Sequence, residues 1–152
     1  MLHDNVRSFL RSVSQLTSRS QLAYERWQRL QATAESMTAR YGDAPSGGKT
    51  DPHKDAVWQS AIAAREQFRS AYNAAAEREQ EVAMLVDRLP KQEHRVLLHY
   101  RYLAGLRWSD VLKSMEKHNL YYSERQMFNL HGEALKALRK IYREGDDTDV
   151  DS

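Results

Sequence analysis

A short run of polar side chains near the end of the chain has the residue types needed to recognise nucleic acid. The run is SERQMFN, residues 123–129, and it contains an arginine, a glutamine and an asparagine. Arginine can form two hydrogen bonds with the edge of a guanine, and asparagine or glutamine can form two with an adenine. The expected chemistry is therefore recognition through hydrogen bonds.

These side chains belong to a predicted helix that begins after Ser123, a residue type that favours helix caps. Apolar residues at helical spacing define the face expected to be buried. They are Met127, Leu130, Ala134, Leu135, Leu138 and Ile141. The opposite face opens with Glu124, Arg125, Phe128 and Asn129 and continues with His131 and Gly132. A helix that enters the major groove presents its first turns to the base edges, so this end of the helix is the expected reading face.

Basic side chains surround the reading face. Lysine and arginine contact phosphate oxygens, and such contacts position a protein on nucleic acid without reading its sequence. We expect phosphate contacts from Arg107, Lys113, Lys136, Arg139, Lys140 and Arg143.

A shorter helix and a turn precede the reading helix. Ser109 is the expected N-cap of the shorter helix, and Val111, Leu112 and Met115 are its expected buried face. The turn lies within residues 116–122, EKHNLYY. A short helix, a turn and a longer helix form the layout of a helix-turn-helix.

Another helix leads into this unit. The pair Leu89-Pro90 separates it from the helix before, because proline cannot continue a helix. It ends at Gly105, a residue type typical of helix ends. Its expected buried residues are Val96, Leu97, Tyr100 and Leu103. Arg95 and Arg101 are expected to point outward.

The positive charge of the chain is concentrated in the same region. Residues 1–87 carry 11 basic and 11 acidic side chains, whereas residues 88–143 carry 12 basic and 5 acidic ones. Residues 144–152 carry 5 acidic side chains and no basic one, and we expect them to form a disordered acidic tail. A basic module between a neutral segment and an acidic tail indicates a polyanionic partner.

Residues 2–41 predict one long helix with a single apolar seam. Apolar residues recur in alternating steps of three and four, which is the pattern of a coiled coil. They are Leu2, Val6, Phe9, Val13, Leu16, Ala23, Trp27, Leu30, Ala34, Met37 and Tyr41, and Ser20 is the one exception. Such a stripe needs a partner helix to cover it.

A second long helix is predicted to follow a loop over residues 42–54, where glycine and proline cluster. From Asp55 to Leu89 the same seam spacing returns, and Arg78 is the one misfit. Two long helices joined by a short loop fold back as an antiparallel hairpin. A hairpin alone has little room for a core, so we expect it to form a homodimer or to rest against the C-terminal module.

Composition places the chain in the all-α class. The sequence has 6 glycines, 3 prolines and no cysteine, so disulfides and thiolate metal sites are excluded. No apolar run reaches the roughly 18 residues of a membrane helix, and we expect a cytoplasmic protein without membrane contact.

The histidines lack carboxylates at ligand spacing, and neither a phosphate-binding glycine loop nor a nucleophile elbow occurs. We therefore expect no catalytic residues, no metal and no cofactor.

Several framework positions follow a known pattern. They are Leu89-Pro90, Arg101-Tyr102, Gly105-Leu106, and Ala134-Leu135 with Leu138-Arg139. In these positions residues 85–141 resemble region 4 of sigma-70-type factors, although residues 116–120 make the turn longer than in that family. The motifs YSERQ and LHGEAL, residues 122–126 and 130–135, are similar to those of small phage and prophage regulators of late genes of the ArpU/RinA type.

The resemblance implies a transcription regulator that binds double-stranded promoter DNA of phage or prophage late genes, with RNA polymerase as a second partner. It places six residues against the major groove. They are Ser123, Glu124, Arg125, Gln126, Phe128 and Asn129.

Two other functions fit the same pattern. The sigma-like module could bind RNA polymerase or a sigma factor as an adaptor or inhibitor, with the acidic tail covering its basic face. A phage packaging small subunit also combines a helix-turn-helix with helices that oligomerise. In each case the expected organisation is a helical platform in residues 1–89, the helix-turn-helix in residues 90–143 and the tail in residues 144–152.

Overall fold

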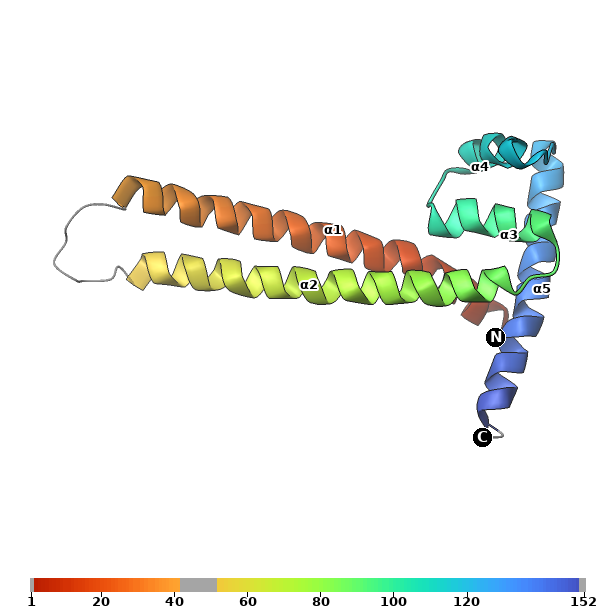
Figure 1. Ribbon diagram of the computed structural model, residues 1–152, viewed down its shortest axis with the longest axis horizontal. Helices are drawn as coiled ribbons and strands as arrows, with labels where there is room; N and C mark the ends of the chain where they lie inside the picture. Colours follow the sequence, from red (N-terminus) through yellow and green to blue (C-terminus); the bar gives the residue numbers. More distant parts are fainter. Residues whose placement is uncertain (1, 42–51, 151–152) are drawn as a thin grey trace. The chain divides into compact units, whose positions relative to one another are not determined.

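The computed structural model describes residues 2–41 and 52–150, with side chains over residues 5–40 and 52–143. Over this part of the chain the structure is helical and contains no strand (Figure 1). In chain order the elements are α1 (Leu2–Tyr41), α2 (Pro52–Asp87), α3 (Gln92–Leu98), the π-helical turn η1 (His99–Leu103), α4 (Trp108–Met115), the 3₁₀ turn η2 (Glu116–His118) and α5 (Glu124–Val150). The predicted all-α class is confirmed. None of the described helices is both long and apolar enough to cross a membrane.

The chain divides into two compact units. One consists of Met1–Gln15 and Ala76–Ser152, and the other of Leu16–Ala75. The structure therefore does not divide at residue 89 as expected. The reason is that the first turns of α1 and the last turns of α2 share an apolar core with α3, α4 and α5.

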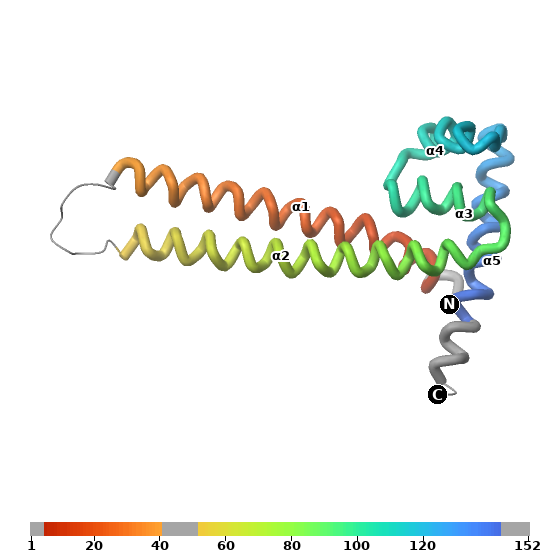
Figure 2. The backbone as a smooth tube through the Cα atoms, viewed as in Figure 1, coloured from red at the N-terminus to blue at the C-terminus, as the bar shows by residue number. Residues whose placement is uncertain are grey.

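Within Leu16–Ala75, α1 and α2 lie side by side and run in opposite directions (Figure 2). Trp27 of α1 stacks on Phe68 of α2, with ring centroids 5.7 Å apart. Nearer the end of α1, the indole N–H of Trp58 donates a hydrogen bond to the hydroxyl of Thr38 at 3.1 Å. The buried residues of this unit are small: Ser20, Ala34, Ala61, Ala64 and Ala75. Small side chains let the two helices approach closely but leave the larger seam residues half-buried.

α2 begins earlier than the sequence predicts. It starts at Pro52, so residues 52–54 of the expected loop are helical. Proline suits the first turn of a helix, because the N–H groups of that turn have no partner within the helix. The rest of the expected loop, residues 42–51, lies outside the described residues.

The core of the other unit joins residues that are far apart in the sequence. α1 contributes Val6, Leu10 and Val13, and α2 and the residues after it contribute Val82, Val86 and Leu89. The C-terminal helices contribute Leu97, Leu98, Val111, Met115, Met127, Leu130, Ala134, Leu135 and Leu138. The helical spacing predicts most of this set but misses Leu10, Val86 and Leu98, which are 0%, 1% and 0% exposed. They lie beside the predicted stripes, and they are buried because each helix meets neighbours on more than one side.

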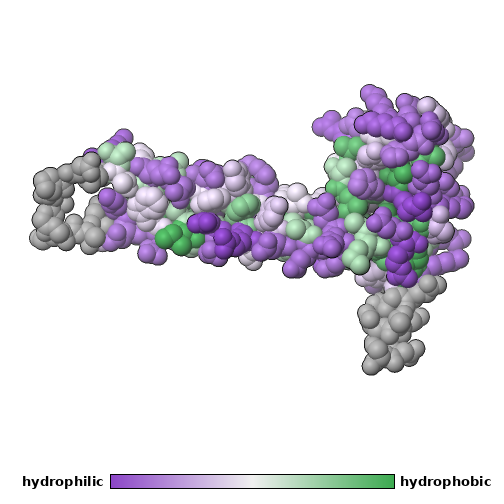
Figure 3. Space-filling view, in the orientation of Figure 1, coloured by the Kyte–Doolittle hydropathy of each residue, from purple (hydrophilic) through white to green (hydrophobic). Residues whose placement is uncertain are grey.

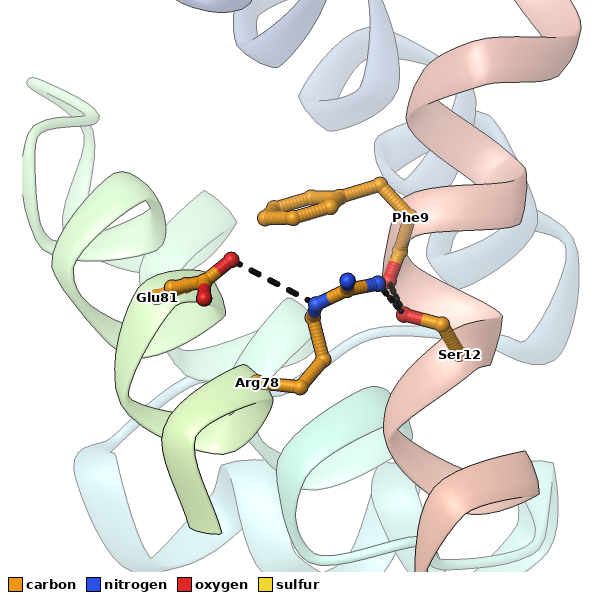
Figure 4. Close-up of polar contacts among 4 residues, drawn as sticks. All are labelled: Phe9, Ser12, Arg78 and Glu81. Carbon is orange, nitrogen blue, oxygen red and sulfur yellow. Dashed lines mark hydrogen bonds and ion pairs between the residues drawn. The ribbon is translucent and has the colours of Figure 1, made fainter. Parts of the chain in front are cut away.

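Arg78, the misfit on the α2 seam, is held by contacts with α1 and with its own helix (Figure 4). Its guanidinium donates a hydrogen bond to the Ser12 hydroxyl at 2.6 Å and lies 5.2 Å from the centroid of the Phe9 ring. Its Nε lies 3.4 Å from the Glu81 carboxylate. A long cationic side chain thus occupies an apolar seam position, where Ser12, Phe9 and Glu81 compensate its charge although the Nε itself is buried without a hydrogen-bond partner.

Proline and glycine mark the helix ends near the expected places. α2 ends at Asp87, shortly before Leu89-Pro90. After η1, Gly105 adopts a φ of +69°, a left-handed conformation that glycine accepts without strain. The next helix begins at Trp108, one residue before the expected cap. Ser109 is therefore inside α4, because the backbone is already helical ahead of it.

Two arginines expected to point outward are half-buried. A guanidinium N–H of Arg95 donates to the carbonyl of Leu89 at 2.5 Å, and one of Arg101 donates to the carbonyl of Leu106 at 2.9 Å. Both acceptors lie in the connections between helices, where backbone carbonyls lack helical partners. These arginines therefore stabilise the connections.

α5 continues beyond the basic segment. It extends to Val150 and so includes most of residues 144–152, which were expected to be disordered. No proline follows Pro90 in the sequence, and extending an existing helix costs less free energy than starting one. Residues 151–152 lie outside the described residues.

Candidate nucleic-acid interface

The turn between α4 and α5 is a capped helix end. Asn119, which follows η2, has a φ of +62°. Its N–H donates to the carbonyl of Glu116 at 3.0 Å, and the N–H of Leu120 donates to the carbonyl of Met115 at 3.2 Å. These two bonds form a Schellman motif, in which asparagine can take the place of glycine. The extra residues 116–120 are thus accommodated in a helix cap.

Ser123 and Gln126 close the first turn of α5. The N–H of Gln126 donates to the Ser123 hydroxyl at 3.2 Å, and the N–H of Ser123 donates to the Gln126 side-chain oxygen at 2.8 Å. This reciprocal pair is a capping box. The predicted cap at Ser123 is confirmed. Both side chains were also expected to contact bases, but the Ser123 hydroxyl oxygen and the Gln126 side-chain oxygen accept hydrogen bonds from the backbone here.

Arg125 and Asn129 are available on the exposed face of α5. Both are exposed, and the same face continues with Lys136, Lys140 and Arg143 at steps of three and four residues. Gly132 lies in the middle of this face, and a Cβ added there would meet nothing within 4 Å. The helix backbone is therefore open to an outside partner at Gly132. We call Arg125, Asn129, Lys136, Lys140 and Arg143 the α5 face.

Glu124 and Phe128 complete the predicted base-contact set. Glu124 is exposed in the first turn of α5, where the helix dipole favours a carboxylate. Phe128 is 43% exposed, and its ring packs edge-on against Trp108 with centroids 5.2 Å apart. Phe128 thus contacts the protein through one side of its ring and solvent through the other.

The predicted phosphate contacts differ in exposure. Arg107 precedes α4 and Lys113 lies on it, and both are exposed, as is Arg143 on α5. Arg139 is half-buried, and its Nε is buried without a hydrogen-bond partner. Arg139 is therefore the least accessible of the six to a nucleic-acid backbone.

Lys136 and Lys140 border a hollow of about 500 Å³, together with Lys91. His94 also lines this hollow, although only 4% of its surface is exposed, and its Nε2 lies 3.9 Å from the Glu133 carboxylate. Burial lowers the pKa of His94, so the ring is neutral at neutral pH. Glu133 is therefore the acidic residue that lines this hollow with Lys91, Lys136 and Lys140.

A second histidine, His131, is buried behind the α5 face. It is 8% exposed, and its Nε2 lies 2.8 Å from the hydroxyl of Tyr102. Burial first, and then the charges of Arg7, Arg101 and Arg11, lower the pKa of His131 to about 4. The ring is therefore neutral at pH 7 and can accept a hydrogen bond from Tyr102.

The prediction that His131 lies on the exposed side of α5 is wrong, because only 8% of its surface is exposed. The spacing could have located it, because His131 lies four residues from both Met127 and Leu135, which are buried. Burial also raises the pKa of Tyr102, so its hydroxyl keeps its proton at neutral pH.

Comparison with protein-family models, with curated proteins and with solved structures finds no match to this chain. The candidate interface therefore rests on the residues and geometry of the chain itself. Among the side chains that the structure describes, no three His, Cys, Asp or Glu groups gather as metal ligands would.

His131 predicts how stability depends on pH. Its pKa is about 4 in the folded chain and returns to about 6.5 on unfolding. The unfolded chain therefore binds more protons between pH 7 and 5. The free energy of unfolding should fall across this window, with a contribution from His131 on the order of 1–2 kcal/mol.

Urea denaturation of the protein and of His131→Gln at pH 7, 6 and 5 measures this contribution. Glutamine keeps an acceptor for Tyr102 but does not titrate, and every other group is common to both proteins. The variant should lose less stability than the parent as the pH falls. Parallel losses in the two proteins would show that His131 is not buried in its neutral form.

Proposed function

We propose that this protein is a DNA-binding transcription regulator that places the α5 face in the major groove of double-stranded DNA. α4, the turn and α5 act in this proposal as a helix-turn-helix, and the major groove is wide enough to admit one helix. The observation that carries the proposal is the α5 face itself. Its exposed residues are one arginine, one asparagine and three further basic side chains, and the exposed Glu133 lies beside Lys136 and Lys140.

The target in this proposal is promoter DNA of phage or prophage late genes, read in the cytoplasm of a bacterial host. The resemblance of residues 85–141 to sigma region 4, and of residues 122–135 to small phage regulators, supports this choice. RNA polymerase is a second partner that the same resemblance supports.

Base reading in this proposal depends on few side chains. Ser123 and Gln126 are engaged in the capping box, so Arg125 and Asn129 are the polar residues of the predicted set best placed to form paired hydrogen bonds with bases. Phosphate contacts then supply a large share of the affinity, and binding should fall steeply as salt rises.

The homodimer expected from the N-terminal helices is part of the proposal. Within Leu16–Ala75, hydrophobic residues reach the surface (Figure 3), and Leu22, Ile62 and Tyr72 are exposed. A second copy would cover part of this apolar surface.

Light scattering should give twice the mass of one chain for the unmodified protein, and Ile62→Asp should shift the measured mass toward that of one chain. A mass of one chain for the unmodified protein at micromolar concentration would contradict the dimer.

Two variants of the α5 face test the proposed DNA contacts. DNA sites are first selected from a random duplex library, and affinity is then measured for a selected and a scrambled duplex at several salt concentrations. Arg125→Ala should reduce the preference for the selected site by about 1–3 kcal/mol. Lys140→Ala should weaken binding to both duplexes equally and lower the salt slope by about one unit.

Arg65→Ala is the matched control, because Arg65 is exposed on α2 within the other unit. It should leave both affinities unchanged. If Arg125→Ala lowered the affinity for both duplexes equally, the proposed base contact of Arg125 would be contradicted.

A protein-binding adaptor is the second candidate. Tyr121 lies just before α5 and Phe128 lies in its first turns. Their side chains are 68% and 43% exposed, and aromatic residues are enriched at protein interfaces. This candidate predicts no salt-sensitive DNA binding by the unmodified protein. It also predicts binding to RNA polymerase or a sigma factor that Phe128→Ala weakens.

A further inference from the structure

A cavity of about 450 Å³ opens among the first turns of α1, the end of η1 and the start of α5, all within one compact unit. Arg7 and Arg11 of α1 line it, as does Arg101 of η1. The described side chains that line it include no carboxylate. Small-molecule sites in proteins have volumes of about 300–1,000 Å³, so this cavity can hold a small ligand.

Among the described side chains, no carboxylate pairs with the arginines of this cavity. Arg7 and Arg11 lie four residues apart on α1, a spacing at which like charges repel. Over the part of the chain with described side chains, neither they nor Arg101 joins an ion pair. An anion bound among the three guanidiniums would turn this repulsion into attraction.

Arg101 is already fixed in place. One guanidinium N–H donates to the carbonyl of Leu106 at 2.9 Å, and the guanidinium lies 4.5 Å from the centroid of the Trp108 ring. Arginine has five N–H donors, so others remain free for an anion. A side chain held in this way loses little further freedom when a ligand binds.

Aromatic rings line the same cavity. Trp108 and Phe128 are both lining residues, and Phe128 keeps 43% of its surface exposed. An exposed aromatic ring can pack on the flat face of a nucleobase. His131 also lines the cavity and is neutral at pH 7, because its pKa is lowered to about 4. The charge of the cavity therefore comes from its arginines.

We propose that this cavity binds a nucleoside phosphate, with Arg7, Arg11 and Arg101 on the phosphate and Phe128 against the base. Guanidinium groups form paired hydrogen bonds with phosphate oxygens, and the ring adds a surface that an inorganic anion would not use. The phosphate could belong to a free nucleotide or to nucleic acid, since both present the same groups. The proposal does not depend on DNA binding by the α5 face.

Isothermal titration calorimetry of the full chain with ADP, ribose 5-phosphate and adenosine tests the proposal. ADP should bind most tightly, and adenosine most weakly. The double variant Arg7→Gln/Arg11→Gln should weaken ADP binding by about tenfold or more, because it removes two charge-assisted contacts. Both residues are exposed, so the change should not disturb the core. Arg19→Gln, on an exposed residue of α1 in the other unit, should change nothing.

Phe128→Ala tests the base-binding part of the site independently of the phosphate-binding part. It should weaken ADP binding and leave ribose 5-phosphate binding unchanged. Equal effects on the two ligands would overturn the placement of the base. Equal affinity of the unmodified protein for ADP and adenosine would overturn the phosphate site.

A short DNA duplex, titrated with the same proteins, distinguishes the source of the phosphate. If the double variant weakens ADP binding and spares the duplex, a free nucleotide is the ligand. If it weakens both, nucleic acid also supplies the phosphate. No effect on either would overturn the proposal. Lys140→Ala, measured in parallel, should weaken duplex binding and leave ADP binding unchanged. The two variants therefore test DNA binding by the α5 face and phosphate binding in the cavity separately.

Discussion

The first turns of α1 pack inside the core that holds α3, α4 and α5 together. Val6, Leu10 and Val13 are buried in one cluster with residues from each of those helices. Fully burying one such side chain contributes about 1.5–3 kcal/mol, and a chain of this size has a stability of only about 5–15 kcal/mol. The start of the chain is therefore a structural part of the unit that carries the α5 face. The same packing brings Arg7 and Arg11 to the cavity beside Arg101.

The local structure of this unit could largely be predicted from the sequence, because helix periodicity and caps act over a few residues. The buried face of α5 through Leu138 and the cap at Ser123 follow from such short-range rules. Side chains that depend on long-range packing could not be found in this way. Leu10 is buried because α1 meets several helices, and His131 is buried because α5 has a wider covered face than its apolar stripe indicates.

In the candidate interface, one local signal was overlooked. Residue types identified the polar run, and the Ser-x-x-Gln spacing of Ser123 and Gln126 is the pattern of a capping box, in which each side chain bonds to the other's backbone. The other predicted base-contacting residues follow a turn that is capped on both sides, by the Schellman motif at Asn119 and by the capping box. Under the proposed function, a small set of base-contacting residues on a basic helix would suit a regulator whose affinity comes mainly from phosphate contacts and whose selectivity a dimer would increase.

The most direct test of this account measures how the C-terminal helices depend on Leu10. In a chain with Trp27→Phe and Trp58→Phe, Trp108 fluorescence reports urea unfolding of these helices. Leu10→Ala should lower their free energy of unfolding by about 2–4 kcal/mol. Leu22→Ala, at a position of the same helix that is 64% exposed, should have little effect. Unchanged unfolding of Trp108 in Leu10→Ala would show that α3, α4 and α5 form their core without the start of the chain.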